Sequence, residues 1–171
     1  MKADQVRTYI VERFPDLMVA ENFGDIFFIY DPHGDLPPKR QMPFATIVVG
    51  DTYDSTSALA TDGAFRLNIG LTKDTYLSLF GPVPTIRDEN GVYATDYDYT
   101  VRDQLMPHPI YAGQHWACVV APGVETFEAL TPLLAEAYGF AARKDANWRA
   151  RGRSGATGDN SGAVDGDPES R

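Results

Sequence analysis

The side chains best suited to bind a small molecule are Arg66 and Asn68, which alternate with apolar residues in a short segment that ends at Gly70. Residues two apart on a β-strand share a face, so Arg66 and Asn68 face one way while Phe65 and Leu67 face the other. A guanidinium fork beside an amide can bind a carboxylate or another small anion. The spacing therefore predicts a polar site on the sheet face that points away from the core.

Three more polar rings lie further along the chain, next to a second expected strand that begins at His115. We expect Trp116 to face the helices together with Cys118 and Val120, because burying its large side chain is worth roughly 2–3 kcal/mol. His115 then lies on the polar face, where a titratable imidazole can also bind an anion. The alternative is that this face is an ordinary solvated sheet surface. The candidate ligand-binding residues are Arg66, Asn68, His108, Tyr111 and His115.

Other chemistry finds little support in the residue types. His108 and His115 lack a third His, Cys or Glu at the spacing typical of a metal site, and Asp96 and Asp98 are not followed by the glycine and glutamate of a calcium loop. Cys118 lies in an apolar run, which is typical of a buried cysteine. The chain has no Gly-x-Ser-x-Gly elbow and no glycine-rich phosphate loop. We therefore predict no catalytic residue, no metal site and no cofactor.

A small antiparallel sheet flanked by helices would position these residues. Apolar spacing of three and four residues predicts helices near both ends, and apolar runs between them predict strands. This order is typical of a two-layer α+β fold in which the helices pack on one face of the sheet. We expect Pro132 to kink the last helix or to split off its first turns. The expected helices are 3–14, 72–80, two turns at 100–106, and 124–144, and the expected strands are 17–20, 25–30, 44–49, 64–70 and 115–121.

Length and composition indicate one domain, since 171 residues with 43% apolar residues can build a sizeable core. From Asp145 onward apolar residues nearly vanish, so we predict a folded domain over residues 1–144 and a disordered tail over residues 145–171. No apolar run approaches the roughly 18 residues that span a membrane, and the chain begins without the pattern of a signal peptide. The single cysteine cannot form an internal disulfide. These features favour a cytoplasmic protein without a membrane partner.

The charge distribution argues against nucleic acid as a partner. The chain carries a net charge of −9, and residues 149–171 hold equal numbers of acidic and basic side chains, so the whole net charge falls on residues 1–148. An acidic body repels polyphosphate at long range, and nucleic-acid binders usually present a basic face. The basic pairs Lys39-Arg40 and Arg143-Lys144 are too small to reverse this balance.

Two segments resemble the bacterial MmcQ/YjbR-like proteins, and more closely an uncharacterised family related to them. The first is FRLNIG at residues 65–70, and the second is PHPIYAGQHWACVVAPGVETFEALTPLLAEAY at residues 107–138. The resemblance implies a CyaY-like fold over roughly residues 1–143 and leaves the activity open. The loops at 31–42 and 82–99 are longer than the MmcQ/YjbR pattern, so a ligand surface could differ there.

We therefore predict a non-enzymatic binding or interaction module that uses the open polar face of the sheet. The alternative is a small enzyme or a ligand-responsive regulator with an anion site at the five candidate residues. The expected partner is a small anion or another protein. We expect a monomer or a weak homodimer.

Overall fold

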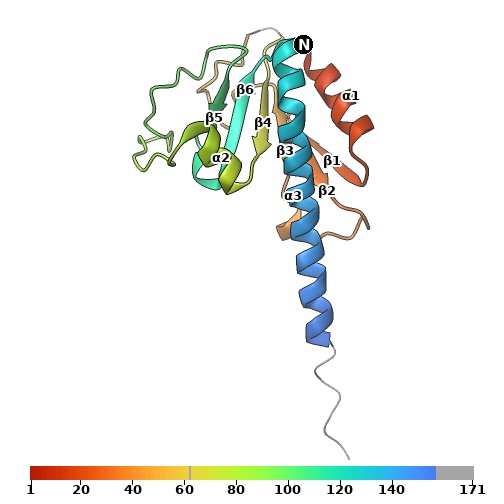
Figure 1. The fold of residues 1–171 in the computed structure, drawn as a ribbon. Helices are drawn as coiled ribbons and strands as arrows, with labels where there is room; N and C mark the ends of the chain where they lie inside the picture. Colours follow the sequence, from red (N-terminus) through yellow and green to blue (C-terminus); the bar gives the residue numbers. More distant parts are fainter. Residues whose placement is uncertain (62, 157–171) are drawn as a thin grey trace, which may run out of the picture.

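A six-stranded antiparallel sheet in the order β1-β2-β3-β4-β6-β5 forms the centre of the structure (Figure 1). The computed structural model describes residues 1–61 and 63–156. The strands are β1 (Leu17–Asn22), β2 (Asp25–Tyr30), β3 (Ala45–Val48), β4 (Arg66–Gly70), β5 (Leu105–Pro107) and β6 (Trp116–Val120). The helices are α1 (Ala3–Arg13), α2 (Lys73–Phe80) and α3 (Val124–Ala156), with single 3-10 turns η1 (Pro38–Arg40) and η2 (Ala112–Gln114).

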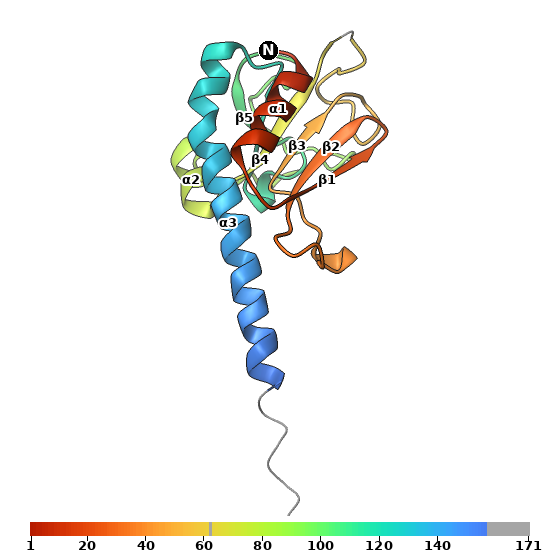
Figure 2. The same cartoon turned by 90° about the vertical axis from the view of Figure 1, so that its right-hand side faces the viewer.

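The helices pack on one face of the sheet, where they bury the larger of two apolar clusters. Figure 2 shows α1 and α3 together on the same side of the strands. Leu67 and Ile69 of β4 face this cluster beside Ala117 and Val119 of β6. The α+β prediction, with helices on one face of an antiparallel sheet, is confirmed. None of the helices in residues 1–61 and 63–156 is long and apolar enough to cross a membrane.

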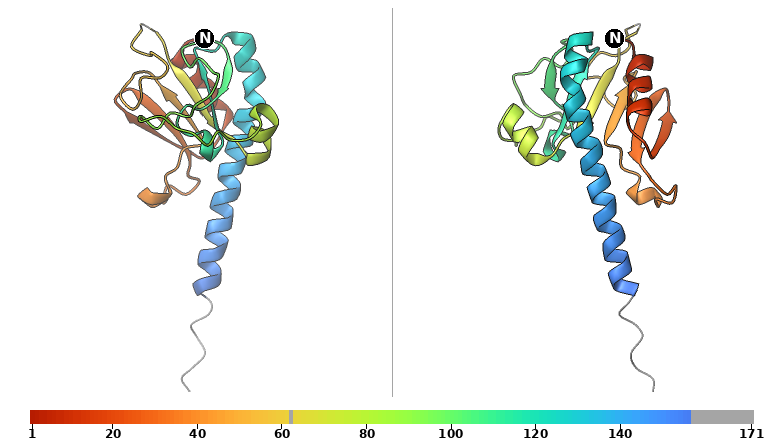
Figure 3. Two further views of the ribbon diagram at one scale, coloured as in Figure 1. Left: turned by 90° about the vertical axis from the view of Figure 1, so that its left-hand side faces the viewer. Right: turned by 45° about the vertical axis from the view of Figure 1, so that its right-hand side comes forward.

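Loops cover part of the opposite face, as the left view in Figure 3 shows. A second, smaller apolar cluster lies beneath them, in which Leu59 and Tyr99 from the loops meet Met106, Cys118 and Val120 from the strands. The expectation of an open sheet face is therefore wrong for this part of the sheet. The uncovered remainder forms the pocket described below.

Local sequence patterns place most of these elements correctly. The β1–β2 hairpin turns at Phe23 and Gly24, both with positive φ, as a type I′ hairpin turn requires. The Thr72 hydroxyl accepts the Thr75 N–H at the start of α2, as expected for an N-cap. The expected helical turns at 100–106 are wrong, because β5 forms an edge strand there. An edge position tolerates Pro107, which has no N–H to donate to a neighbouring strand.

Helix α3 passes through Pro132 without a break and is longer than the sequence predicted. Pro132 has no N–H for the carbonyl of Glu128, four residues earlier, and the Thr131 hydroxyl donates to that carbonyl instead, at 2.8 Å. The helix continues to Ala156, so the predicted disorder is wrong for residues 145–156. The rest of the predicted tail lies outside the described residues.

Long-range contacts hold the extended part of α3 against the loop that follows β2. The Arg149 guanidinium bonds Asp145 on its own helix at 2.8 Å and Asp35 in the loop at 2.7 Å. The guanidinium of Arg40 lies over the Trp148 ring, 4.9 Å from its centre. The helix end is therefore tied to residues more than a hundred positions earlier in the chain.

We predict that a chain ending at Ala156 is as stable as the full chain, whereas a chain ending at Lys144 loses about 1 kcal/mol of unfolding free energy. The shorter chain lacks the Arg149 ion pairs and the Arg40–Trp148 contact, which are partly exposed and therefore weak. Urea unfolding of the three chains measures this difference. Equal stability of all three would mean that the extension contributes nothing to the fold.

Candidate functional site

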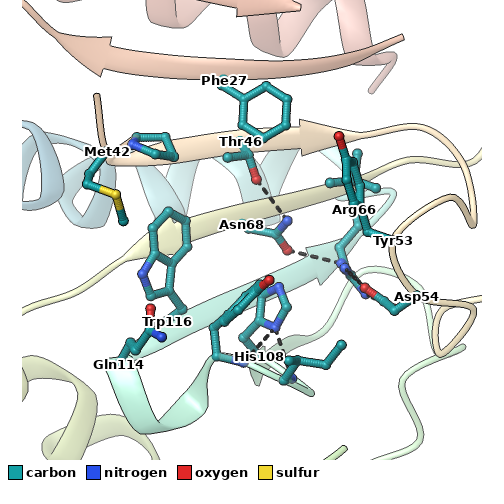
Figure 4. A pocket seen from close by; sticks show the side chains of 14 residues that line it. Phe27, Met42, Thr46, Tyr53, Asp54, Arg66, Asn68, His108, Gln114 and Trp116 are labelled. Carbon is teal, nitrogen blue, oxygen red and sulfur yellow. Dashed lines mark hydrogen bonds and ion pairs between the residues drawn. The ribbon is translucent and has the colours of Figure 1, made fainter. Parts of the chain in front are cut away.

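A cavity of about 410 Å³ opens on the sheet face opposite the helices, and we call it the sheet pocket (Figure 4). Pockets for small molecules usually measure roughly 300–1,000 Å³. Strands β2, β3, β4 and β6 provide its floor, and three loop segments provide its walls. The lining residues are Phe27, Met42, Pro43, Thr46, Val48, Tyr53, Asp54, Arg66, Asn68, His108, Ile110, Tyr111, Gln114 and Trp116.

The Arg66 side chain lies flat in the floor, with only 2% of its surface exposed. Its two terminal nitrogens donate to the two carboxylate oxygens of Asp54, at 2.7 and 3.0 Å. The Nε–H donates to the Asn68 amide oxygen at 3.0 Å, and Nη1 also donates to the Ser57 hydroxyl at 2.9 Å. All three nitrogens of the guanidinium are therefore bonded to other groups of the protein itself.

The polar row continues from β4 to β3. Thr46 lies directly opposite Asn68 in the sheet register, so both side chains point into the pocket floor. The Asn68 amide nitrogen donates to the Thr46 hydroxyl at 2.9 Å. An unbroken chain of hydrogen bonds thus runs from Thr46 through Asn68 and Arg66 to Asp54, as the dashed lines in Figure 4 indicate.

The ion pair keeps Asp54 charged. Burial by itself would raise the pKa of Asp54, but the hydrogen bonds and charge of Arg66, with a further bond from Thr56, outweigh burial and lower this pKa to about 2. Positive and negative charge in the floor therefore cancel at neutral pH. The expectation that Arg66 offers its guanidinium to an anion is wrong, because Asp54 already occupies it.

His108 is a buried, neutral imidazole in the pocket wall. Its Nδ1 accepts the backbone N–H groups of Ile110 and Tyr111, both at 3.1 Å, which leaves the ring proton on Nε2. Burial, with the nearby charge of Arg66, lowers the pKa of His108 to about 3. The ring thus stays uncharged at neutral pH, and Nε2–H is the donor that it can offer to a ligand.

Trp116 faces the sheet pocket, so the predicted orientation of β6 is wrong. In the observed register Trp116 lies opposite Gly70, and Cys118 lies opposite Asn68 on the same face. A Cβ atom on Gly70 would lie 3.1 Å from the Trp116 ring, so the missing side chain leaves room for the indole. The alternate residues of β6, Ala117 and Val119, face the helices instead.

His115 is therefore on the other side of the chain from the proposed site. It ends η2 in the left-handed conformation, with φ of 63°, and its ring packs against Tyr76 of α2 at 5.5 Å between centres. The other four candidate residues, Arg66, Asn68, His108 and Tyr111, all line the sheet pocket.

Sequence reasoning missed Asp54, Thr46 and Trp116. A local signal for Asp54 did exist, because an arginine in a central strand needs a buried carboxylate, and the loop at 51–62 is rich in aspartate. Cys118 is buried as predicted, and burial raises the pKa of its thiol to about 12. Within residues 1–61 and 63–156, no three His, Cys, Asp or Glu side chains are placed to hold a metal ion.

Residues 1–151 match the model of DUF6194, a family of unknown function. The chain belongs to this family. The DUF6194 match covers every residue of the sheet pocket and most of α3. No curated protein and no solved structure matches the chain significantly, and none of the comparisons links it to the MmcQ/YjbR-like proteins.

We predict that replacing Asp54 by Asn lowers the free energy of unfolding by roughly 3–5 kcal/mol at pH 7, because a charged Arg66 then stays buried without its partner. The matched control is Glu21→Gln, which removes an ion pair with Arg7 of the same 2.7 Å length on the exposed surface. That change should cost less than about 1 kcal/mol. Similar losses in the two variants, measured by urea unfolding, would show that the Asp54–Arg66 pair is not essential.

We predict that His108 makes the protein less stable as the pH falls. Below its ordinary pKa of 6.5 the unfolded chain binds a proton on His108, whereas the folded protein does not until about pH 3. Unfolding free energy should therefore fall between these values by up to about 1.4 kcal/mol per pH unit. The variant His108→Asn keeps an acceptor for the two backbone N–H groups and should show a flatter pH profile. Identical profiles would mean that His108 titrates normally.

Proposed function

We propose that this DUF6194 protein is a binding domain that takes up a small, uncharged and largely apolar molecule in the sheet pocket. One observation carries the proposal: the two ionised side chains that line the pocket, Arg66 and Asp54, are bonded to each other. A charged ligand would have to give up its hydration without meeting a free countercharge. An uncharged ligand avoids this penalty.

The pocket walls suit a flat apolar group. Trp116, Phe27 and Tyr53 provide aromatic surface from three different parts of the chain. Tyr111 and Met42 stand at the rim and remain about half exposed or more, at 47% and 62%. Methionine adapts its shape readily to a neighbouring group, so this rim can close on a bound molecule.

The polar groups of the pocket suit one hydrogen-bonding group on the ligand. His108 can offer its Nε2–H, and Gln114 provides an amide elsewhere in the pocket lining. A carbonyl or ether oxygen is the matching acceptor. The expected ligand is therefore an aromatic or alicyclic molecule with one neutral acceptor.

Binding fits this pocket better than catalysis. His108 is uncharged at neutral pH and its Nδ1 already accepts two backbone N–H groups, so it is a poor proton carrier. The Cys118 thiol is buried and protonated. The floor residues that could act as acid or base, Arg66 and Asp54, neutralise each other.

We further propose a CyaY-like fold, a cytoplasmic location and a weakly associating protein that does not bind nucleic acid. The antiparallel sheet with helices on one face is compatible with the CyaY-like arrangement of the MmcQ/YjbR-like proteins. The single buried cysteine suits a cytoplasmic protein. The acidic chain suits a monomer or weak homodimer that does not bind nucleic acid.

Two dyes that differ by one sulfonate group test the proposed ligand class. In the variant Trp148→Phe, Trp116 is the single tryptophan, so its fluorescence reports directly on the pocket. We expect uncharged N-phenyl-1-naphthylamine to quench Trp116 with saturation. The anionic counterpart, 8-anilino-1-naphthalenesulfonate, should bind roughly tenfold more weakly or worse at this site, since it must desolvate a charge.

Dye fluorescence in two further variants gives the control. Trp116→Leu should weaken binding of the uncharged dye, whereas Trp148→Leu, on α3 and outside the pocket lining, should leave binding unchanged. Tighter quenching of Trp116 by the sulfonate dye would contradict the proposal. So would uncharged-dye binding that does not depend on Trp116.

A further inference from the structure

The basic pair Lys39-Arg40 and one residue of the second basic pair, Lys144, come together in the structure. Lys39 and Arg40 form η1 in the loop after β2, and Lys144 lies on α3. These three side chains line one cavity of about 170 Å³, which we call the basic pocket. The chain carries a net charge of −9, so this cluster of cations is opposite in sign to the charge of the whole protein.

The acidic groups nearby are already occupied. Asp145 lines the basic pocket, but both of its carboxylate oxygens accept bonds from Arg149 Nε, at 2.8 and 3.0 Å. Asp35 of the same loop accepts two bonds from the other nitrogens of Arg149. Among the described residues, none of the ion pairs involves Lys39, Arg40 or Lys144. The cavity is therefore lined by three positive charges that have no carboxylate partner among the described residues.

Aromatic rings hold two of these cations in place. The Arg40 guanidinium lies 4.9 Å from the centre of the Trp148 ring, and Lys144 Nζ lies 4.6 Å from the centre of the Phe140 ring. Partial burial and the positive charge of Arg40 both lower the pKa of Lys144. The two cations thus repel each other across the gap between the loop and α3, and an anion between them would relieve that repulsion.

We propose that the basic pocket binds a small phosphate-class oxyanion, with Arg40, Lys144 and Lys39 as its ligands. An arginine fork and lysine ammonium groups are the usual partners of phosphate oxygens. The cavity of about 170 Å³ leaves room for a phosphate group among these three side chains. The bound anion would join the loop to α3.

This site is separate from the proposed function. Met42 is the one residue that lines both cavities, and the cationic side chains of the basic pocket do not line the sheet pocket. Binding of an uncharged molecule in the sheet pocket and binding of phosphate in the basic pocket can therefore fail independently.

Calorimetric titration with inorganic phosphate, at ionic strength held constant with chloride, tests the proposal on the full chain. We expect saturable binding in the wild type, and binding weaker by roughly tenfold or more in Arg40→Gln and in Lys144→Gln. The matched control is Arg143→Gln, which removes the same charge from the neighbouring position of α3 but does not line the cavity. Its affinity for phosphate should equal that of the wild type.

A second titration, with glycerol phosphate, distinguishes free phosphate from a phosphate ester, and binding of either one supports a phosphate-class site. Equal weakening in all three variants would overturn the proposal, because it would mean that only the overall charge matters. The absence of saturable binding of both anions in the wild type would overturn it as well. Circular dichroism confirms that each variant is folded before it is titrated.

Discussion

The buried ion pair between Arg66 and Asp54 is the interaction on which the pocket depends. An arginine keeps its charge in a protein, so placing one in the central strand β4 is tolerable only if a carboxylate reaches it. Asp54 does so from the loop between β3 and β4, which must therefore lie over the sheet. Within the same loop, the Asp51 carboxylate accepts the N–H groups of Leu59 and Ala60 and so stabilises the loop conformation. The pocket wall formed by Tyr53 follows from this placement.

The same pair determines what the pocket can bind. A lone arginine in this position would make an anion site, whereas a neutralised one makes a polar but uncharged floor under aromatic walls. Charge that could attract an anion is found in the basic pocket, where Lys39 and Arg40 of η1 and Lys144 of α3 line one cavity. The molecule thus separates an uncharged cavity from a cationic one, with Met42 between them.

Local sequence patterns predicted much of the fold. The features that these patterns missed depend on contacts between residues that are far apart in the sequence. Strand alternation correctly placed Arg66 and Asn68 on the face away from the helices, because the period of a strand needs no knowledge of its neighbours. The predicted orientation of Trp116 was wrong, because the size of a side chain does not decide which face of the sheet has room for it. Gly70 on the adjacent strand leaves that room, and the pairing of β4 with β6 cannot be read from either segment alone. The sequence did not predict the extension of α3 for a similar reason. Arg149 is paired with Asp35, which lies in a loop more than a hundred residues earlier in the chain.

The pKa of Asp54 tests the account most directly. A carbon-13 NMR titration of its side-chain carboxyl, with Asp54→Asn to assign the signal, measures this value in the folded protein. The account predicts a pKa of about 2, because Arg66 holds the carboxylate in its charged form. A pKa at or above the ordinary value of 3.8 would contradict the account, since Arg66 would then be free to bind an anion and the sheet pocket would not be neutral.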